Sequence, residues 1–166
     1  FVMSQAFIRD LEDECSVSLR DVKRCITLIG VFYSQLKGRA QAAPRHSHHM
    51  STRYRSYAAE SDGHSETMKS IVLAFALCYQ CRLATSTRRH EYRSSFAHIA
   101  RRHDHRIREP DFATIVETEQ RLYLSSMELP HGTALNLALL ENVFVILICI
   151  LTRIPVFVVG KPGCSK

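Results

Sequence analysis

The sequence lacks any hydrophobic run long enough to cross a membrane. No unbroken apolar stretch, Val143–Leu151 included, exceeds nine residues, whereas a membrane-spanning helix needs roughly 18–20. Thr152, Arg153 and Pro155 then interrupt the sequence that follows. The N-terminal segment also lacks the pattern of a signal peptide, because it becomes acidic from Asp10 onward. We therefore expect no transmembrane segment and no cleaved leader.

Cysteines with the spacing of zinc ligands are also scarce. The six cysteines stand at positions 15, 25, 78, 81, 149 and 164, and most fall within apolar patterns, where a free thiol packs as a small hydrophobic group. Cys78 and Cys81 form a single C-x-x-C pair with no second pair, so we expect no zinc site there. His46, His48 and His49 have no carboxylate or cysteine in register, so we favour solvated histidines over a metal site. A reduced, cytosolic chain is expected rather than a secreted disulfide framework.

Acidic residues are few in the middle of the chain. The whole sequence has 22 Lys+Arg and 16 Asp+Glu, a net charge of +6, and residues 37–108 alone contribute 14 basic and 5 acidic residues. Tyr92 and Phe96 lie among the arginines, and basic patches with aromatics are typical of nucleic-acid binding. A solvated arginine face is commoner, and we favour it over a nucleic-acid partner. The arginines concerned are Arg88, Arg89, Arg93, Arg101, Arg102, Arg106 and Arg108.

Apolar residues at helical spacing predict a well-marked helix over residues 18–36. Ser18 followed by Asp21 resembles a capping box, which indicates that the helix begins there. Apolar residues repeat every three or four positions, so we expect them to form the buried face of this helix. That predicted face consists of Leu19, Val22, Ile26, Ile29, Phe32, Tyr33 and Leu36.

The rest of the chain predicts further helices around one long loop. Residues 37–66 have too few apolar side chains to offset the entropy of ordering them, so we expect a loop or insertion. Residues 67–84 predict a buried helix, followed by a short basic helix marked by Tyr92, Phe96 and Ile99.

Pro110 suits the first position of the next helix. The apolar side of that helix is expected to consist of Phe112, Ile115, Val116, Leu122 and Tyr123. His131 and Gly132 predict a break, after which Thr133 is expected to cap a helix through Leu151.

The end of the sequence carries the motif that points to chemistry. Val156–Val159 predicts a short buried strand directly before a glycine turn, and the turn matches the phosphate-loop pattern G-x-x-x-x-G-K-[ST] with two departures. A serine replaces the glycine before the lysine, and the final Ser/Thr would be residue 167. The glycines permit backbone N–H groups to approach phosphate oxygens at the start of a helix. The predicted nucleotide-binding residues are Gly160, Lys161, Pro162, Gly163, Cys164, Ser165 and Lys166.

Two stretches of the sequence resemble the mysterin (RING finger protein 213) family of giant AAA+ ATPases and ubiquitin ligases. Residues 141–166 look like the segment that enters a Walker A loop in that family, and Ser165 is similar to the family's variant loop. Residues 17–24 resemble the lid helix that ends the preceding AAA+ module. The resemblance covers most of the chain; it is strong over residues 1–36 and 110–166, and thin over residues 38–66 and 85–108.

The resemblance implies an α/β P-loop NTPase of the AAA+ type, mostly helical here, with one core strand leading into the phosphate loop. Residues 1–36 would be the helical lid of one module, and residues 37–66 a His/Ser-rich loop or insertion. Residues 67–109 would be a basic inter-module segment, and residues 110–166 the start of the next module. Arg20 falls where such lids place the sensor-2 arginine, whose fork of donors binds phosphate. Helix geometry alone favours a solvated residue of the first turn at Arg20, and the resemblance makes the sensor-2 role about equally expected.

The resemblance also implies cofactors and partners. The cofactors would be ATP and Mg²⁺, with a magnesium ligand at the position after Lys166 and zinc only in domains outside this chain. The partners would be other AAA+ modules of the same protein and, through that protein, ubiquitin and a ubiquitin-conjugating enzyme. The expected location is the cytosol, with lipid-droplet association as a further implication. Walker B acids, sensor 1 and an arginine finger are absent from the sequence, so the chain alone is expected to be inactive.

Two further expectations concern the chain as a whole. Because it starts at Phe1 rather than methionine and stops within the glycine turn, we expect it to be part of a longer protein. The alternative to an active ATPase is a non-hydrolysing AAA+-like scaffold or interaction segment. Ser165 raises that alternative, because a side chain in place of glycine crowds the phosphate cradle.

Overall fold

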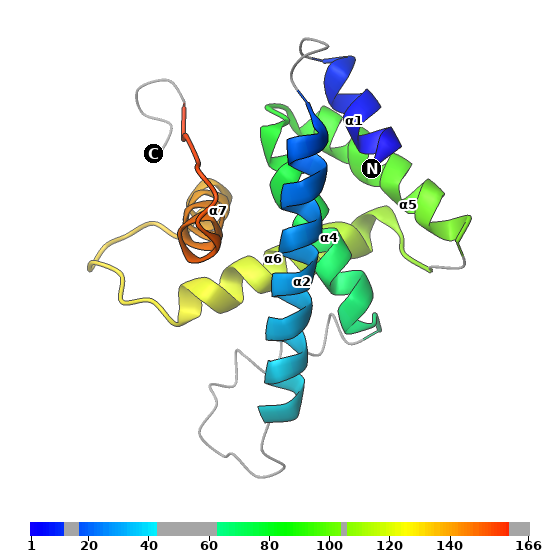
Figure 1. The fold of residues 1–166 in the computed structure, drawn as a ribbon. Coiled ribbons are helices and arrows are strands. Elements are labelled where there is room, and N and C mark those ends of the chain that lie inside the picture. Colours follow the sequence, from blue (N-terminus) through cyan, green and yellow to red (C-terminus); the bar gives the residue numbers. More distant parts are fainter. Residues whose placement is uncertain (12–16, 43–62, 104–105, 160–166) are drawn as a thin grey trace. The chain divides into compact units, whose positions relative to one another are not determined.

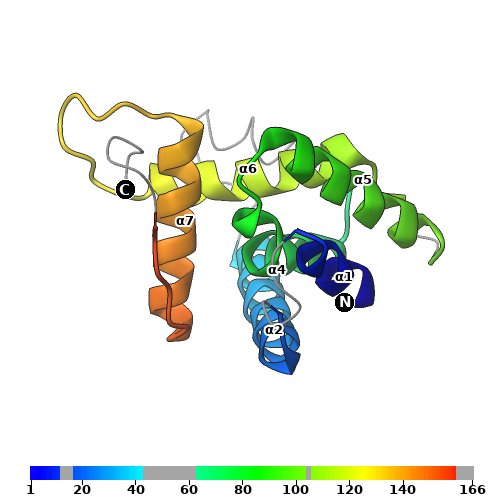
Figure 2. The same ribbon diagram turned by 90° about the horizontal axis from the view of Figure 1, so that it is seen from above.

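A computed structural model describes residues 1–11, 17–42, 63–103 and 106–159 of the chain. The chain divides into two compact units, residues 1–116 and residues 117–166, and each is considered by itself (Figures 1 and 2). Every regular element in the described residues is helical. The first unit contains α1 (Val2–Arg9), α2 (Leu19–Ala42), α4 (Glu66–Cys78), the 3₁₀ turn η2 (Gln80–Arg82), α5 (Ser86–Arg101) and the first part of α6 (Glu109–Ser125). The second contains the rest of α6 and α7 (Leu137–Thr152).

The start of α2 confirms the predicted cap. The Ser18 backbone N–H donates to the Asp21 carboxylate at 2.8 Å, and the Arg20 N–H donates to the Ser18 hydroxyl oxygen at 3.2 Å. These bonds satisfy donors that the first turn of a helix leaves without partners. The helix continues to Ala42, six residues beyond the predicted end. Most of the predicted loop therefore falls on residues 43–62, which lie outside the described residues.

The predicted buried face of α2 is confirmed at Phe32 and is wrong at Leu19, Ile26 and Tyr33. Cys25, Leu28 and Phe32 are buried, whereas Leu19 is 85% exposed and Ile26 57% exposed. Apolar residues on α2 satisfy a helical repeat in two registers, and the sequence alone favours the register with the larger side chains. The packing against α4 selects the other one, in which a cysteine serves as a small hydrophobic residue.

α4 forms the centre of the first unit, as its apolar sequence predicts. The Ser65 hydroxyl oxygen accepts the Met68 N–H at 3.3 Å and caps the helix. Buried residues cover every side of α4 from Val72 to Leu77. Such an all-round apolar helix is typical of a core position. α2 lies along it, and α1 lies beside α5 (Figure 1).

A chain of aromatic contacts joins the helices of the first unit. Phe96 lies 5.4 Å from Phe75 and 5.0 Å from Phe112 between ring centroids, both edge-to-face. Tyr92 extends the cluster, and its hydroxyl hydrogen-bonds the Ser4 hydroxyl of α1 at 2.9 Å. Burial raises the pKa of Tyr92 well above its usual value, with the Ser4 hydrogen bond acting in the opposite direction. The predicted amphipathic helix is thus confirmed, with its aromatic residues directed into the core.

In the second unit, α7 is capped by a different residue from the predicted one. The Asn136 side-chain oxygen accepts the Leu139 N–H at 2.8 Å, so Thr133 is not the cap. The Thr133 hydroxyl instead donates to the Pro130 carbonyl at 2.7 Å and closes the preceding turn. Gly132 adopts φ +85° in that turn, which confirms the predicted break and explains the glycine. The Phe144 ring packs against Tyr123 of α6, with 5.6 Å between their centroids.

None of the helices in the described parts of the chain combines the length and the apolar character that crossing a membrane requires.

Candidate functional site

The segment that leads to the predicted phosphate loop begins at the C-terminus of α7. The Ile154 N–H donates to the Cys149 carbonyl at 2.9 Å, and the Arg153 N–H donates to the Ile150 carbonyl at 3.2 Å. Arg153 has φ 56° and ψ 33°, the left-handed conformation. These features define a Schellman motif, which ends the helix and satisfies its last carbonyls. Pro155 then prevents the helix from resuming.

Residues 154–159 follow this motif without forming a strand, so the predicted core strand is not confirmed. Phe157 is 90% and Val159 91% exposed, whereas Val156 and Val158 are both below 40%. This alternation has the period of two that extended backbone produces. A strand also needs a neighbour that accepts and donates its ladder of hydrogen bonds, and the described residues include no second strand. The β-branched composition predicts extended backbone here but cannot supply the partner.

The predicted phosphate loop lies outside the described residues. Its members therefore remain sequence predictions: Gly160, Lys161, Pro162, Gly163, Cys164, Ser165 and Lys166. The described segment fixes what precedes them, namely a terminated helix and six residues that carry the chain to Gly160.

Arg20, the predicted sensor-2 residue, lies in the first turn of α2 and is exposed. The neighbouring carboxylate of Asp21 bonds Ser18 and lies 3.6 Å from an Arg24 guanidinium nitrogen. Within the described parts of the chain, no acidic side chain pairs with the Arg20 guanidinium. Arg20 is therefore accessible to an anion that approaches the start of α2.

The arginines of α5 and of the segment after it are mostly engaged within the protein. Arg93 donates to the Glu109 carboxylate, which also accepts a contact from His90 at 3.1 Å. Arg88 pairs with Glu91 at 3.0 Å. Tyr92 and Phe96, which sequence analysis considered as stacking residues, are buried. These contacts favour a structural role for the cluster over a nucleic-acid surface.

The start of α6 holds two carboxylates that the sequence analysis did not single out. Asp111 accepts the Arg108 backbone N–H at 2.8 Å and two guanidinium hydrogen bonds, at 3.1 and 3.0 Å. Hydrogen bonding by Arg108 lowers the pKa of Asp111 below its usual value. His64, just before α4, lies 3.7 Å from the same carboxylate. Together with the Arg93–Glu109 pair, these contacts connect the N-terminus of α6 to α5 and to the start of α4, so they are structural.

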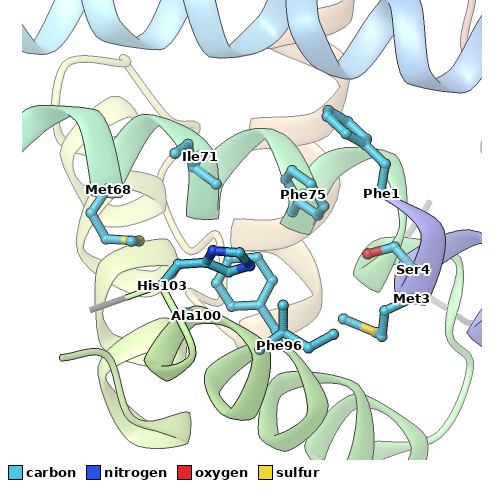
Figure 3. A pocket seen from close by; sticks show the side chains of 10 residues that line it. Phe1, Met3, Ser4, Met68, Ile71, Phe75, Phe96, Ala100 and His103 are labelled. Atoms are coloured by element: carbon cyan, nitrogen blue, oxygen red, sulfur yellow. The ribbon is translucent and has the colours of Figure 1, made fainter. Parts of the chain in front are cut away.

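A cavity of about 230 Å³ lies between α1, α4 and α5 (Figure 3). Its walls are mainly apolar: Phe75 comes from α4 and Phe96 from the facing α5, with Met3 and Met68 toward opposite ends. His103 is the one ionisable side chain in the lining. The lining has no acidic side chain, and its one hydroxyl, that of Ser4, is hydrogen-bonded to Tyr92, so the lining residues form no catalytic constellation.

Two cysteines of the core lie close together on facing helices. A hydrogen bond with Cys25 of α2 and burial raise the pKa of Cys78 of α4 well above its usual value. Thiols in such surroundings are unreactive and poor metal ligands. In the described ranges, no group of three His, Cys, Asp or Glu side chains is arranged to hold a metal ion. The candidate histidines His46, His48 and His49 lie outside those ranges.

The comparisons with known proteins address the C-terminal segment most directly. Residues 132–166, which include α7, residues 154–159 and the predicted loop, match the family model described as "RNF213 AAA domain". This part of the chain is thus of the AAA+ class.

Curated relatives match almost the whole chain. The chain is 34% identical to the human E3 ubiquitin-protein ligase RNF213 over 172 residues, and 33% identical to the mouse protein of that name over 164 residues. It is 32% identical to the zebrafish E3 ubiquitin-protein ligase rnf213-beta over 167 residues. The chain therefore belongs to the RNF213 family. Each match covers 98% of this chain and 3% of the relative's length. No solved structure matches the chain.

Proposed function

We propose that residues 154–166 form the entry to a nucleotide site of an AAA+ module, with Gly160–Lys166 as its phosphate-binding loop. The observation that carries this proposal is the family match over residues 132–166, because it includes the glycine-lysine turn in the expected position after α7. Backbone N–H groups of the loop would surround the phosphate oxygens of ATP. The Lys166 ammonium would contact the β- and γ-phosphates, and a hydroxyl at position 167 would hold Mg²⁺.

Arg20 would act in a different nucleotide site, that of a preceding AAA+ module. Its guanidinium would contact nucleotide phosphates from the start of α2, as a sensor-2 arginine. Support comes from its exposure and from the lack of an acidic partner within the described residues. A guanidinium that is already paired would have to break that pair before it bound phosphate.

The protein to which this chain belongs would be an ATPase and a ubiquitin-protein ligase of the cytosol. The names of the relatives, each an E3 ubiquitin-protein ligase, support the ligase activity, and the match to an AAA domain supports the ATPase activity. Ubiquitin transfer would occur in zinc-binding domains outside this chain, where ubiquitin and a ubiquitin-conjugating enzyme would bind. The role of this chain would be to couple nucleotide binding in one AAA+ module to nucleotide binding in the next.

Substitution of two lysines in the same loop tests the phosphate-loop proposal. In the complete protein, Lys166→Ala is expected to weaken ATP binding at this site by about 10- to 100-fold, since a charged hydrogen bond contributes about 1.5–3 kcal/mol. Lys161→Ala, the matched control, removes a charge from the loop without removing the phosphate-contacting lysine. Equilibrium titration with a fluorescent ATP analogue measures both. Equal affinities for the two variants would contradict the proposal.

The same titration tests Arg20. Arg20→Ala is expected to lower nucleotide affinity at the preceding module's site, whereas Lys23→Ala, one turn further along the exposed side of α2, leaves it unchanged. Equal effects of both variants would indicate a general charge effect rather than a phosphate contact.

Ser165 favours a second candidate function, a nucleotide-free AAA+-like scaffold. A side chain at this position would crowd the phosphate cradle that a glycine leaves open. Under this alternative, Ser165→Gly creates binding that the natural sequence lacks. Under the main proposal, ATP binds before the substitution, and Ser165→Gly changes the affinity little.

A further inference from the structure

An exposed stripe of apolar residues runs along α2, on a different side from the face that packs on α4. We call it the outer stripe; it consists of Leu19, Val22, Ile26, Ile29, Tyr33 and Leu36. Leu19, Ile26 and Tyr33 are exposed, and the other three are half-buried. The face buried against α4 consists instead of Cys25, Leu28 and Phe32. α2 therefore has two apolar faces, one buried against α4 and one whose residues are exposed or half-buried.

The spacing of the outer stripe is that of a coiled-coil seam. Its residues alternate steps of three and four through two and a half heptads, with Leu19, Ile26 and Tyr33 at one seam position. Side chains in this spacing fit between those of a second helix lying along the first. A globular core needs no such strict alternation, and here the globular core uses the other face. The pattern thus indicates another helix as the occupant.

The charges beside the stripe define the occupant further. Lys23 and Lys37 are exposed at equivalent positions two heptads apart, on the edge away from the buried face. Within the described residues, no carboxylate pairs with either ammonium. The Lys37 ammonium lies 5.7 Å from the centre of the Tyr33 ring, so the charge borders the stripe directly. Acidic side chains at the flanking positions of a partner helix would complement both lysines.

Gly30 lies between these lysines in the same flanking row. A Cβ added there would meet nothing within 4 Å, so no close contact inside the unit requires glycine. Glycine is the least favourable residue inside a helix apart from proline. Its position beside the stripe leaves room for the backbone or a large side chain of a neighbouring helix.

We infer that the outer stripe of α2 docks an amphipathic α-helix with an apolar three-four seam and acidic flanking residues, from outside the described residues of the chain. A second copy of α2 fits poorly. An antiparallel pair would place Lys23 and Lys37 against their own counterparts, and a parallel pair would place Lys37 against Phe32, which is already buried on α4. A helix with acidic flanking residues avoids both placements, because its carboxylates would lie opposite the two lysines.

The test is site-specific photo-crosslinking in the complete protein. A photoreactive amino acid replaces Ile26, or Ser34 as the matched control, which is exposed on the same helix outside the stripe. After irradiation, the linked peptides are sequenced. We expect position 26 to link to a segment with an apolar three-four repeat and acidic flanks, with at least tenfold higher yield than position 34. Charge reversal by Lys23→Glu with Lys37→Glu should lower the yield at position 26 at least fivefold.

Several outcomes would overturn the inference. These are a link to α2 of a second copy, a link to α7, a link to a segment without the acidic flanks, and a yield at position 26 no higher than at position 34. An unchanged yield after charge reversal would also contradict it. Because Ile26 and both lysines are exposed, these substitutions leave the packed face of α2 intact, and far-ultraviolet circular dichroism checks that the helices persist.

Discussion

Arg153 shows how one residue directs the chain toward the predicted phosphate loop. It holds the left-handed conformation that ends α7, a conformation that costs a residue with a Cβ about 1–2 kcal/mol. Glycine is the usual residue at this place in a Schellman motif. The hydrogen bonds of Arg153 and Ile154 to the last turn of α7 offset that cost. The direction in which residues 154–159 leave the helix therefore depends on a strained residue.

Arg153→Gly is expected to stabilise the end of α7 by up to about 1 kcal/mol, because the left-handed strain disappears while glycine adds some unfolded-state entropy. Hydrogen exchange of the Ile154 amide should then slow by about fivefold. Arg153→Ala is the matched control, since it removes the guanidinium but keeps the Cβ and the strain. Equal exchange rates in the two variants would show that the backbone conformation is not the source of the effect.

At the scale of the element, α2 is the most informative helix, because one of its faces packs against α4 and another, the outer stripe, is exposed or half-buried. Phe32 is fully buried, whereas Ile26 lies on the outer stripe, although both are large apolar residues of the same helix. The difference in burial predicts a difference in their contributions to the stability of the first unit.

Phe32→Ala is expected to lower the free energy of unfolding of the chain expressed alone by about 3–5 kcal/mol, the usual cost of a large cavity. Ile26→Ala should change it by less than about 0.5 kcal/mol, as exposed substitutions do. Urea unfolding followed by circular dichroism measures both. Comparable losses for the two variants would contradict the assignment of the faces.

The same helix shows how far the sequence predicts the elements. The position of α2, the cap at Ser18 and the buried character of α4 follow from local patterns, and the structure confirms them. Apart from Phe32, the buried face of α2 does not follow from the sequence, because two registers fit the repeat and only packing on α4 chooses between them. The cap of α7 was misassigned because Thr133 and Asn136 are both suitable capping residues. The side-chain bonds of the folded turn decide between them.

At the scale of the whole molecule, the match to the AAA-domain model and the phosphate-loop motif concern the end of the chain, while most of the described packing lies in the first unit. The predicted strand at residues 156–159 depends on parts of the protein beyond these residues. A strand is stabilised by hydrogen bonds to neighbouring strands, and the described residues contain none. The phosphate loop was predicted from residue types that a phosphate cradle requires. Its geometry depends equally on the strand before it and the helix after it.

The most direct test of the phosphate-loop proposal is hydrogen exchange across residues 154–166 of the complete protein, with and without Mg²⁺-ATP. We predict that nucleotide slows exchange at the backbone amides of 160–166, because these groups would donate to phosphate oxygens. We also predict that residues 156–159 are protected in both states, as a paired strand would be. Unchanged exchange at 160–166 in protein saturated with nucleotide would contradict the account.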